Sequence, residues 1–85
     1  MIAYRLRLAG EDLPHWHATL NDARDAGRLL PRLMPENLIE QFDVPTDKNG
    51  VLTLLNGGGE FVAQRFWEFT AKGGLIEVNE EGYRI

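Results

Sequence analysis

The sequence predicts one small domain of the α+β class: an N-terminal strand, two helices, and then a helix followed by a C-terminal β-hairpin. Residues 2–9 alternate between apolar and polar side chains, as a half-buried strand does. Two later stretches place apolar residues at helical spacing, and residues 60–85 contain a helix-patterned segment that leads into two short strand-like runs. With 85 residues the chain has room for a single hydrophobic core, so the domain is expected to span residues 1–85.

The first element is expected to be a strand over residues 2–9 that ends at Gly10. Tyr4, Leu6 and Leu8 would form its apolar face, with arginines on the opposite face.

Two helices should follow this strand. The first begins at residues 11–12, where Asp12 can cap it and Pro14 falls in the first turn. A proline is tolerated there because its missing N–H would have no partner within the helix. The second, shorter helix starts at residues 35–37 and is stopped by Pro45. The apolar positions of the two helices are Leu13, Trp16, Leu20, Ala23 and Gly27 in the first, and Leu38, Ile39 and Phe42 in the second.

Residues 46–59 give mixed signals. Residues 46–50 contain Asn-Gly and predict a turn. Residues 51–55 begin with a β-branched valine, which favours a strand, although their leucines also suit one turn of helix. We expect a strand here, and we expect the glycine run at 57–59 to separate it from the next element.

The C-terminal third is expected to be a helix over residues 60–72, a stop at Gly73-Gly74, and strands over residues 75–79 and 83–85 joined by a tight turn. The run from Phe66 to Ile85 resembles the end of a winged-helix domain, in which a helix leads through Gly-Leu-Ile-Glu into a hairpin ending Gly-Tyr-Arg-Ile. The resemblance implies that this helix and hairpin dock on a partner, either a nucleic acid or another protein.

The distribution of charge favours a protein over a nucleic acid as that partner. The net charge is −4; residues 1–35 carry five arginines and four acids, whereas residues 36–85 carry four basic and nine acidic residues. Phosphate backbones attract lysine and arginine on the docking face. The expected wing would instead present Glu77, Glu80 and Glu81.

Catalytic, cofactor and metal sites are not expected. The chain contains no cysteine and no serine, which removes the commonest nucleophiles and thiolate ligands. His15 and His17 stand two apart, so neither a helix nor a strand would bring them to one metal ion. The glycine run lacks the following Gly-Lys-Ser/Thr of a phosphate-binding loop. The N-terminus lacks the long apolar run of a signal peptide or membrane span, so we expect a cytoplasmic location.

These observations predict a non-enzymatic, acidic protein-interaction module: an adaptor, regulator or inhibitor that docks on another protein through aromatic and apolar surface. A partner with a basic surface and a homodimer are both expected possibilities. The alternative is a winged-helix-like nucleic-acid-binding transcriptional regulator. Trp67 is expected to lie off the core stripe of its helix. The candidate partner-binding residues are Trp67, Phe61, Trp16, Arg24, Arg28, Glu77, Glu80 and Glu81.

Overall fold

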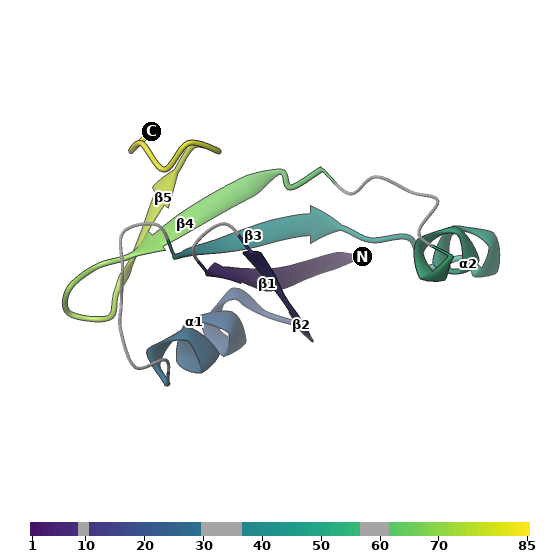
Figure 1. The fold of residues 1–85 in the computed structure, drawn as a ribbon, viewed down its shortest axis with the longest axis horizontal. Helices are drawn as coiled ribbons and strands as arrows, with labels where there is room; N and C mark the ends of the chain where they lie inside the picture. The colour runs from purple at the N-terminus through teal and green to yellow at the C-terminus, as the bar shows by residue number, and fades with distance from the viewer. Residues whose placement is uncertain (9–10, 30–36, 57–61) are drawn as a thin grey trace.

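A computed structural model describes residues 1–8, 11–29, 37–56 and 62–85. In this part of the chain, five strands form one antiparallel sheet in the order β2-β1-β3-β4-β5. One helix, α1, packs on β1, β2 and β3, and a second helix, α2, projects from one end of the molecule (Figure 1). The α+β class is therefore confirmed. The elements are β1 (Ile2–Leu8), β2 (Glu11–His17), α1 (Leu20–Arg28), β3 (Leu38–Asp43), α2 (Lys48–Leu55), β4 (Arg65–Phe69) and β5 (Leu75–Val78).

The sheet carries apolar side chains on both faces. On the face that α1 covers, Ala23 of the helix packs against the sheet residues Leu6, Ile39, Trp67 and Phe69. On the opposite face, a second cluster joins Leu38, Phe66 and Val78. The central strand β3 is consequently buried on both sides along almost its whole length.

Burial on both faces explains why two strands were predicted as helices. Residues 38–43 form β3, and residues 65–69 form β4, which pairs with β3 and β5. A strand with two buried faces loses the alternation that marks a half-buried strand, and its consecutive apolar residues then resemble a helical stripe. The expected helix over residues 60–72 is wrong, and the winged-helix order it belonged to is not found. Residues 60 and 61 lie outside the described residues.

The first helix begins later than expected. Residues 11–17 form the edge strand β2 instead of its first turns, and they pair with β1 through Tyr4 opposite His17 and Arg5 opposite Trp16. Pro14 is accommodated because an edge strand can lack one hydrogen-bond donor. Thr19 is the true N-cap of α1, and its hydroxyl oxygen accepts a hydrogen bond from the Asp22 N–H at 3.1 Å.

The region after β3 is also different from the prediction. Residues 48–55 form α2, so the expected strand at 51–55 is wrong and the helical alternative is correct. The Asp47 carboxylate accepts a hydrogen bond from the Gly50 N–H at 3.0 Å, which places Asn49-Gly50 inside the first turn of a helix and not in a β-turn. The glycine run at 57–59 lies outside the described residues.

The C-terminal hairpin is confirmed in part. β5 covers residues 75–78, as expected. Residues 83–85 form no full strand, because their pairing is limited to a single bridge between Val78 and Arg84. The turn between them is closed by the Asn79 side chain, whose oxygen accepts hydrogen bonds from the N–H groups of Glu81 and Tyr83, both at 3.0 Å.

Gly27 fixes how closely α1 approaches the sheet. It is buried in the last turn of α1, and a Cβ atom at this position would overlap the aromatic ring of Phe69. Glycine to alanine in a helix usually stabilises by roughly 0.5–1 kcal/mol. For Gly27→Ala we expect the opposite sign, a loss of about 1–3 kcal/mol in the free energy of unfolding, because the overlap forces α1 or Phe69 to move. Urea unfolding followed by circular dichroism measures this; a gain in stability would contradict the close packing.

Candidate functional site

The structure separates the residues that the sequence suggested as one partner-binding set. Trp67 is only 7% exposed and belongs to the core under α1, where its ring lies 5.9 Å from that of Tyr4. The expectation that Trp67 lies off the core is therefore wrong. The helical pattern had placed it beside the apolar stripe, whereas in β4 it points toward α1. Phe61 lies outside the described residues.

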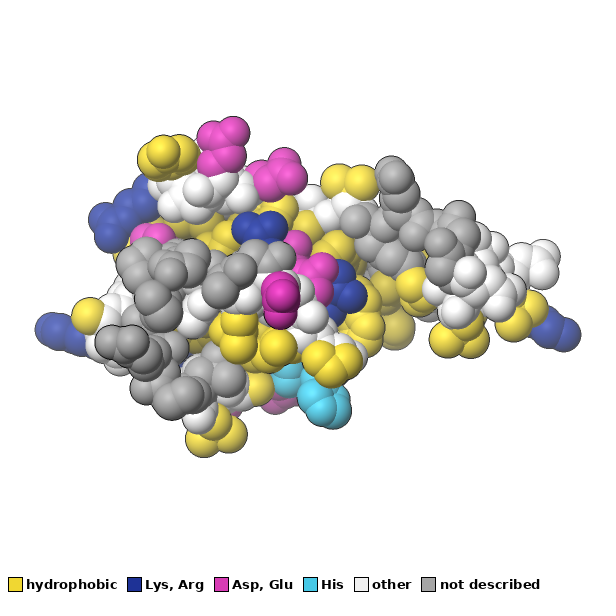
Figure 2. Space-filling model, in the orientation of Figure 1, with side chains coloured by type: hydrophobic (Ala, Val, Ile, Leu, Met, Phe, Trp, Pro, Cys, Tyr) yellow, Lys and Arg dark blue, Asp and Glu magenta, His cyan; other side chains and the backbone are white. Residues whose placement is uncertain are grey.

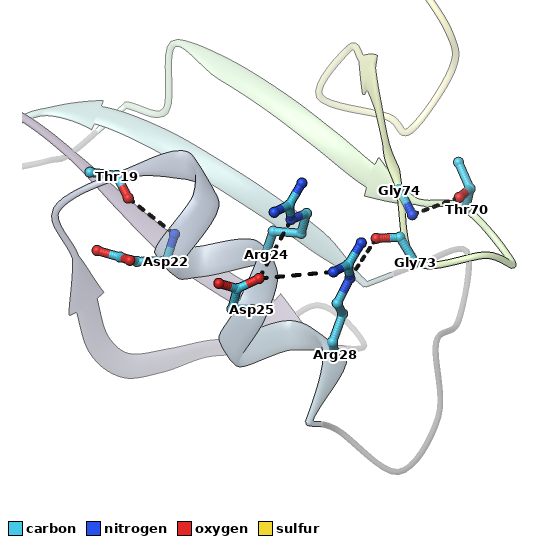
Figure 3. Close-up of polar contacts among 8 residues, drawn as sticks. All are labelled: Thr19, Asp22, Arg24, Asp25, Arg28, Thr70, Gly73 and Gly74. Atoms are coloured by element: carbon cyan, nitrogen blue, oxygen red, sulfur yellow. Dashed lines mark hydrogen bonds and ion pairs between the residues drawn. The ribbon is translucent and has the colours of Figure 1, made fainter.

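Arg24 and Arg28 are engaged inside the domain (Figure 3). The Asp25 carboxylate lies 3.6 Å from Nε of Arg24 and 4.0 Å from Nη1 of Arg28. Nε of Arg28 also donates a hydrogen bond to the carbonyl oxygen of Gly73 at 2.8 Å, which ties the end of α1 to the β4–β5 turn. Arg28 therefore holds the end of α1 against the sheet, whereas the ion pair of Arg24 lies within α1 itself.

The three glutamates of the C-terminal region have different environments. Glu77 accepts two hydrogen bonds from the Arg65 guanidinium, at 2.7 and 3.0 Å, and these bonds lower the pKa of its carboxyl. Glu80 and Glu81 are exposed in the turn after β5, and no ion pair within the described residues involves them. This turn lies toward the C-terminal end of the chain, away from α2 (Figure 1).

Trp16 is the predicted aromatic candidate that the structure does place at the surface. It lies near the end of the edge strand β2 and is 38% exposed. One side of its ring is supported by Phe42, with ring centroids 5.3 Å apart in an edge-on arrangement, and by the Arg5 guanidinium, 4.6 Å from its centroid. These two contacts support the ring while part of it faces solvent.

Two adjoining hollows meet at Trp16, and we call them together the apolar groove. The first has a volume of about 220 Å³ and lies between the sheet and α2. The second has a volume of about 330 Å³ and continues around the ends of β1 and β2. Hydrophobic side chains lie between the body of the sheet and the projecting helix in Figure 2. The groove is lined by Met1, Ile2, Ala3, Trp16, His17, Ala18, Val44, Pro45, Val51 and Leu54.

The groove exists because α2 stands apart from the sheet. Val51 and Leu54 of α2 face Pro45 and Trp16 across the first hollow, yet none of the eight residues of α2 is buried. Leu52 and Leu55 are 44% and 74% exposed. The molecule measures 41 × 24 × 19 Å as a result, long for a domain of this size, with α2 at one end (Figure 1).

A second feature is a group of charged side chains on the sheet face opposite α1. Glu40 of β3 lies opposite Arg5 of β1, and its side chain is almost fully buried. The Arg5 guanidinium pairs with Asp12 at 2.7 Å, and Nη1 of Arg7 lies 3.9 Å from Oε2 of Glu40, too far for a hydrogen bond. Oε1 of Glu40 has no hydrogen-bond partner.

Burial of Glu40 is the main cause of its unusual acidity. Burial, together with the neighbouring Asp12 carboxyl, raises the pKa of Glu40 from 4.5 to about 7, and the two arginines oppose this only in part. A carboxyl with such a pKa can exchange a proton near neutral pH. The two hollows that form the apolar groove are not lined by it, so the structure does not connect this group to a ligand site.

Other classes of site gain no support from the described residues. No group of three or more histidine, aspartate or glutamate side chains among them is arranged to hold a metal ion. Neither of their two helices has the length and apolar character needed to cross a membrane.

Comparison with known proteins gives no relative from which a role could be transferred. No protein-family model, no curated protein and no solved structure matches the chain. The function therefore has to be argued from the residues and their arrangement.

Sequence reasoning found Trp16 but missed the groove around it. The lining residues come from the start of β1, the end of β2, the segment after β3, and α2. Only strand pairing and the position of α2 bring these four segments together. Val44 and Pro45 were available as a signal, because an apolar pair that follows a strand directly needs other apolar residues to cover it.

Proposed function

We propose that the chain is a non-enzymatic protein-interaction module that docks on another protein through the apolar groove. One observation carries the proposal: Trp16, whose ring packs on Phe42, is partly exposed at the meeting point of two apolar hollows. Tryptophan is enriched among the residues that dominate binding energy, especially in pockets from which water can be excluded. Concave surfaces with apolar linings are also where proteins most often bind their ligands.

The chemistry of the groove describes the partner segment that it would accept. Of its lining residues only His17 has a titratable side chain, and the others are aliphatic, aromatic or proline. An apolar side chain or short apolar segment of another protein fits this surface. The acidic character of residues 36–85 would favour a partner that also has a basic surface.

Binding should depend on Trp16 and Leu54 and not on exposed aromatics elsewhere. We expect Trp16→Ala to weaken binding to the partner by about 2 kcal/mol or more, roughly a thirtyfold rise in Kd. Leu54→Asp should have a similar effect, because a carboxylate would face Pro45 and Val44 across the first hollow. The matched control is Tyr83→Ala, which removes an exposed aromatic ring outside the groove.

The experiment is affinity capture from cells that naturally make the chain, followed by titration of the captured protein against each purified variant. A protein that is retained by wild type and Tyr83→Ala but lost by both groove variants supports the proposal. Equal capture by all four chains would show that the groove is not the docking surface.

The alternative role, a nucleic-acid-binding regulator, depended on a docking helix over residues 60–72. Residues 65–69 form β4 instead, so no helix of the described chain presents this segment to DNA. Tight and salt-sensitive DNA binding in a gel-shift titration would nevertheless revive that role in place of the proposed one.

A further inference from the structure

We propose that the apolar groove takes α2 of a second copy of this chain, so that two copies contact each other reciprocally about a twofold axis. This inference rests on the proposed function, because it names a second copy as one protein that docks in the groove. Leu52 and Leu55 of one copy would enter the second hollow of the other.

The first step is that α2 needs a partner. It has eight residues, and isolated helices shorter than ~12–15 residues are marginal in water. Short helices in proteins therefore gain their stability from packing an apolar face. Although four of the residues of α2 are valine or leucine, none of the eight is buried. Its packing within one copy is thus incomplete.

The second step is that the outer face of α2 is apolar and stays largely exposed in the part of the chain that the structure describes. Leu52 and Leu55 are spaced i, i+3 and lie on one side of the helix. Val51 and Leu54 already line the first hollow, whereas Leu52 and Leu55 do not line either hollow of their own copy. These two exposed leucines are therefore available to a second molecule.

The third step is that the second hollow fits them. Its volume is about 330 Å³, and it is lined by Met1, Ile2, Ala3, Trp16, His17 and Ala18. For comparison, an engineered apolar cavity of ~150 Å³ binds a benzene molecule, so there is room for two aliphatic side chains. Charge does not oppose the contact, since Lys48 is the only charged residue of α2 and the N-terminal ammonium of Met1, at the edge of the hollow, is paired with Asp43 at 2.8 Å.

The fourth step is that the contact is reciprocal, so that two copies complete a closed dimer. The two hollows share Met1, Ala3 and Trp16, so helix and acceptor hollow are neighbours on the same molecule. A twofold axis between them makes each copy donor and acceptor at once, which gives a dimer and not an open chain. The contact pairs two leucines with a hollow of six lining residues, fewer than the ~20–30 residues a side of a standard interface, so we expect a weak dimer with a Kd on the order of tens of micromolar.

The test uses disulfide trapping, because the natural chain has no cysteine. Leu55→Cys labels the donor helix and Ala18→Cys labels the acceptor hollow; both positions are exposed, so both variants should fold as wild type by circular dichroism. An equal mixture should form disulfide-linked dimers at least about tenfold faster than either variant alone, because only the mixture pairs helix with hollow. The matched control mixes Leu55→Cys with Glu81→Cys, which lies in the distant C-terminal turn.

Sedimentation equilibrium of the wild-type chain, over concentrations from about a tenth to ten times the expected Kd, completes the test. Concentration-dependent dimers that disappear in Leu55→Asp support the proposal. A strict monomer, a mixture no faster than its control, or rapid trapping of Leu55→Cys with itself would overturn it. If the chain is monomeric yet a different protein is lost with Trp16→Ala, the proposed function stands and only the identity of the partner is wrong.

Discussion

Replacing Trp67 with alanine is expected to remove about 3–5 kcal/mol from the free energy of unfolding. The side chain is 7% exposed and packs with Leu6, Ile39 and Phe69 beneath α1, so its loss leaves a cavity at the centre of the larger core. An 85-residue domain has a total stability of roughly 4–13 kcal/mol. The loss is a large fraction of this total, so the variant should unfold at a much lower urea concentration than wild type, as measured by circular dichroism.

The second tryptophan of the chain provides the control. Trp16→Ala removes the same side chain from a position that is 38% exposed, where the aromatic contact with Phe42 is worth about 0.5–1.5 kcal/mol beyond its buried area. We expect it to lower stability by no more than about 2 kcal/mol while it impairs docking. If the two variants were equally destabilised, the assignment of Trp67 to the core and Trp16 to the surface would be wrong.

Stability should fall as pH rises through the neutral range, because of Glu40. Its pKa is raised to about 7 in the folded chain from 4.5, so between these values the folded state binds more protons than the unfolded state. The free energy of unfolding then decreases with rising pH across this window and levels off above it. One unit of pKa difference is ~1.4 kcal/mol, so the total decrease from this group is about 3–4 kcal/mol.

Glu40→Gln should remove most of this dependence. A neutral amide has no buried charge to stabilise, so we expect the variant to match wild type near pH 5 and to exceed its stability by about 1–3 kcal/mol near pH 8. Urea unfolding at a series of pH values measures the difference. Glu77→Gln is the control, because the change that we expect in the free energy of unfolding has the opposite sign. It removes a carboxyl whose pKa is lowered by Arg65, so it should weaken the fold at pH 8. A Glu40→Gln variant less stable than wild type at pH 8 would show that the charged form is favoured.

The strands differ in how far the sequence could predict them, and the reason is how many of their faces are buried. β1 alternates because Tyr4 and Leu6 pack in the core under α1 while the arginines lie on the opposite face, and its prediction over residues 2–9 agrees with the observed Ile2–Leu8. β3 and β4 are covered on both faces, so Leu38 and Ile39, or Phe66 and Trp67, are apolar neighbours without alternation. From one sequence, this pattern cannot be distinguished from a buried helix.

The candidate site was less predictable than the fold. Trp16 was found because large aromatics are recognisable by type, whereas the groove around it depends on four separated segments and on the place of α2. The arginine pair Arg24 and Arg28 suggested an interface, but Asp25 and the Gly73 carbonyl use both guanidinium groups within the domain. Asp25 is close in sequence to both arginines, whereas the Gly73 partner of Arg28 follows from tertiary structure and leaves no local signal.

The most direct test of docking through the groove is site-specific photo-cross-linking in cells that naturally make the chain. A photoreactive phenylalanine analogue would replace Leu54, which lines the first hollow, and in a separate chain Asn21, which is exposed on α1. The account predicts a discrete cross-linked protein from position 54 and none from position 21. Cross-links from position 21 alone, or none from position 54 while the chain still co-purifies with a partner, would contradict it.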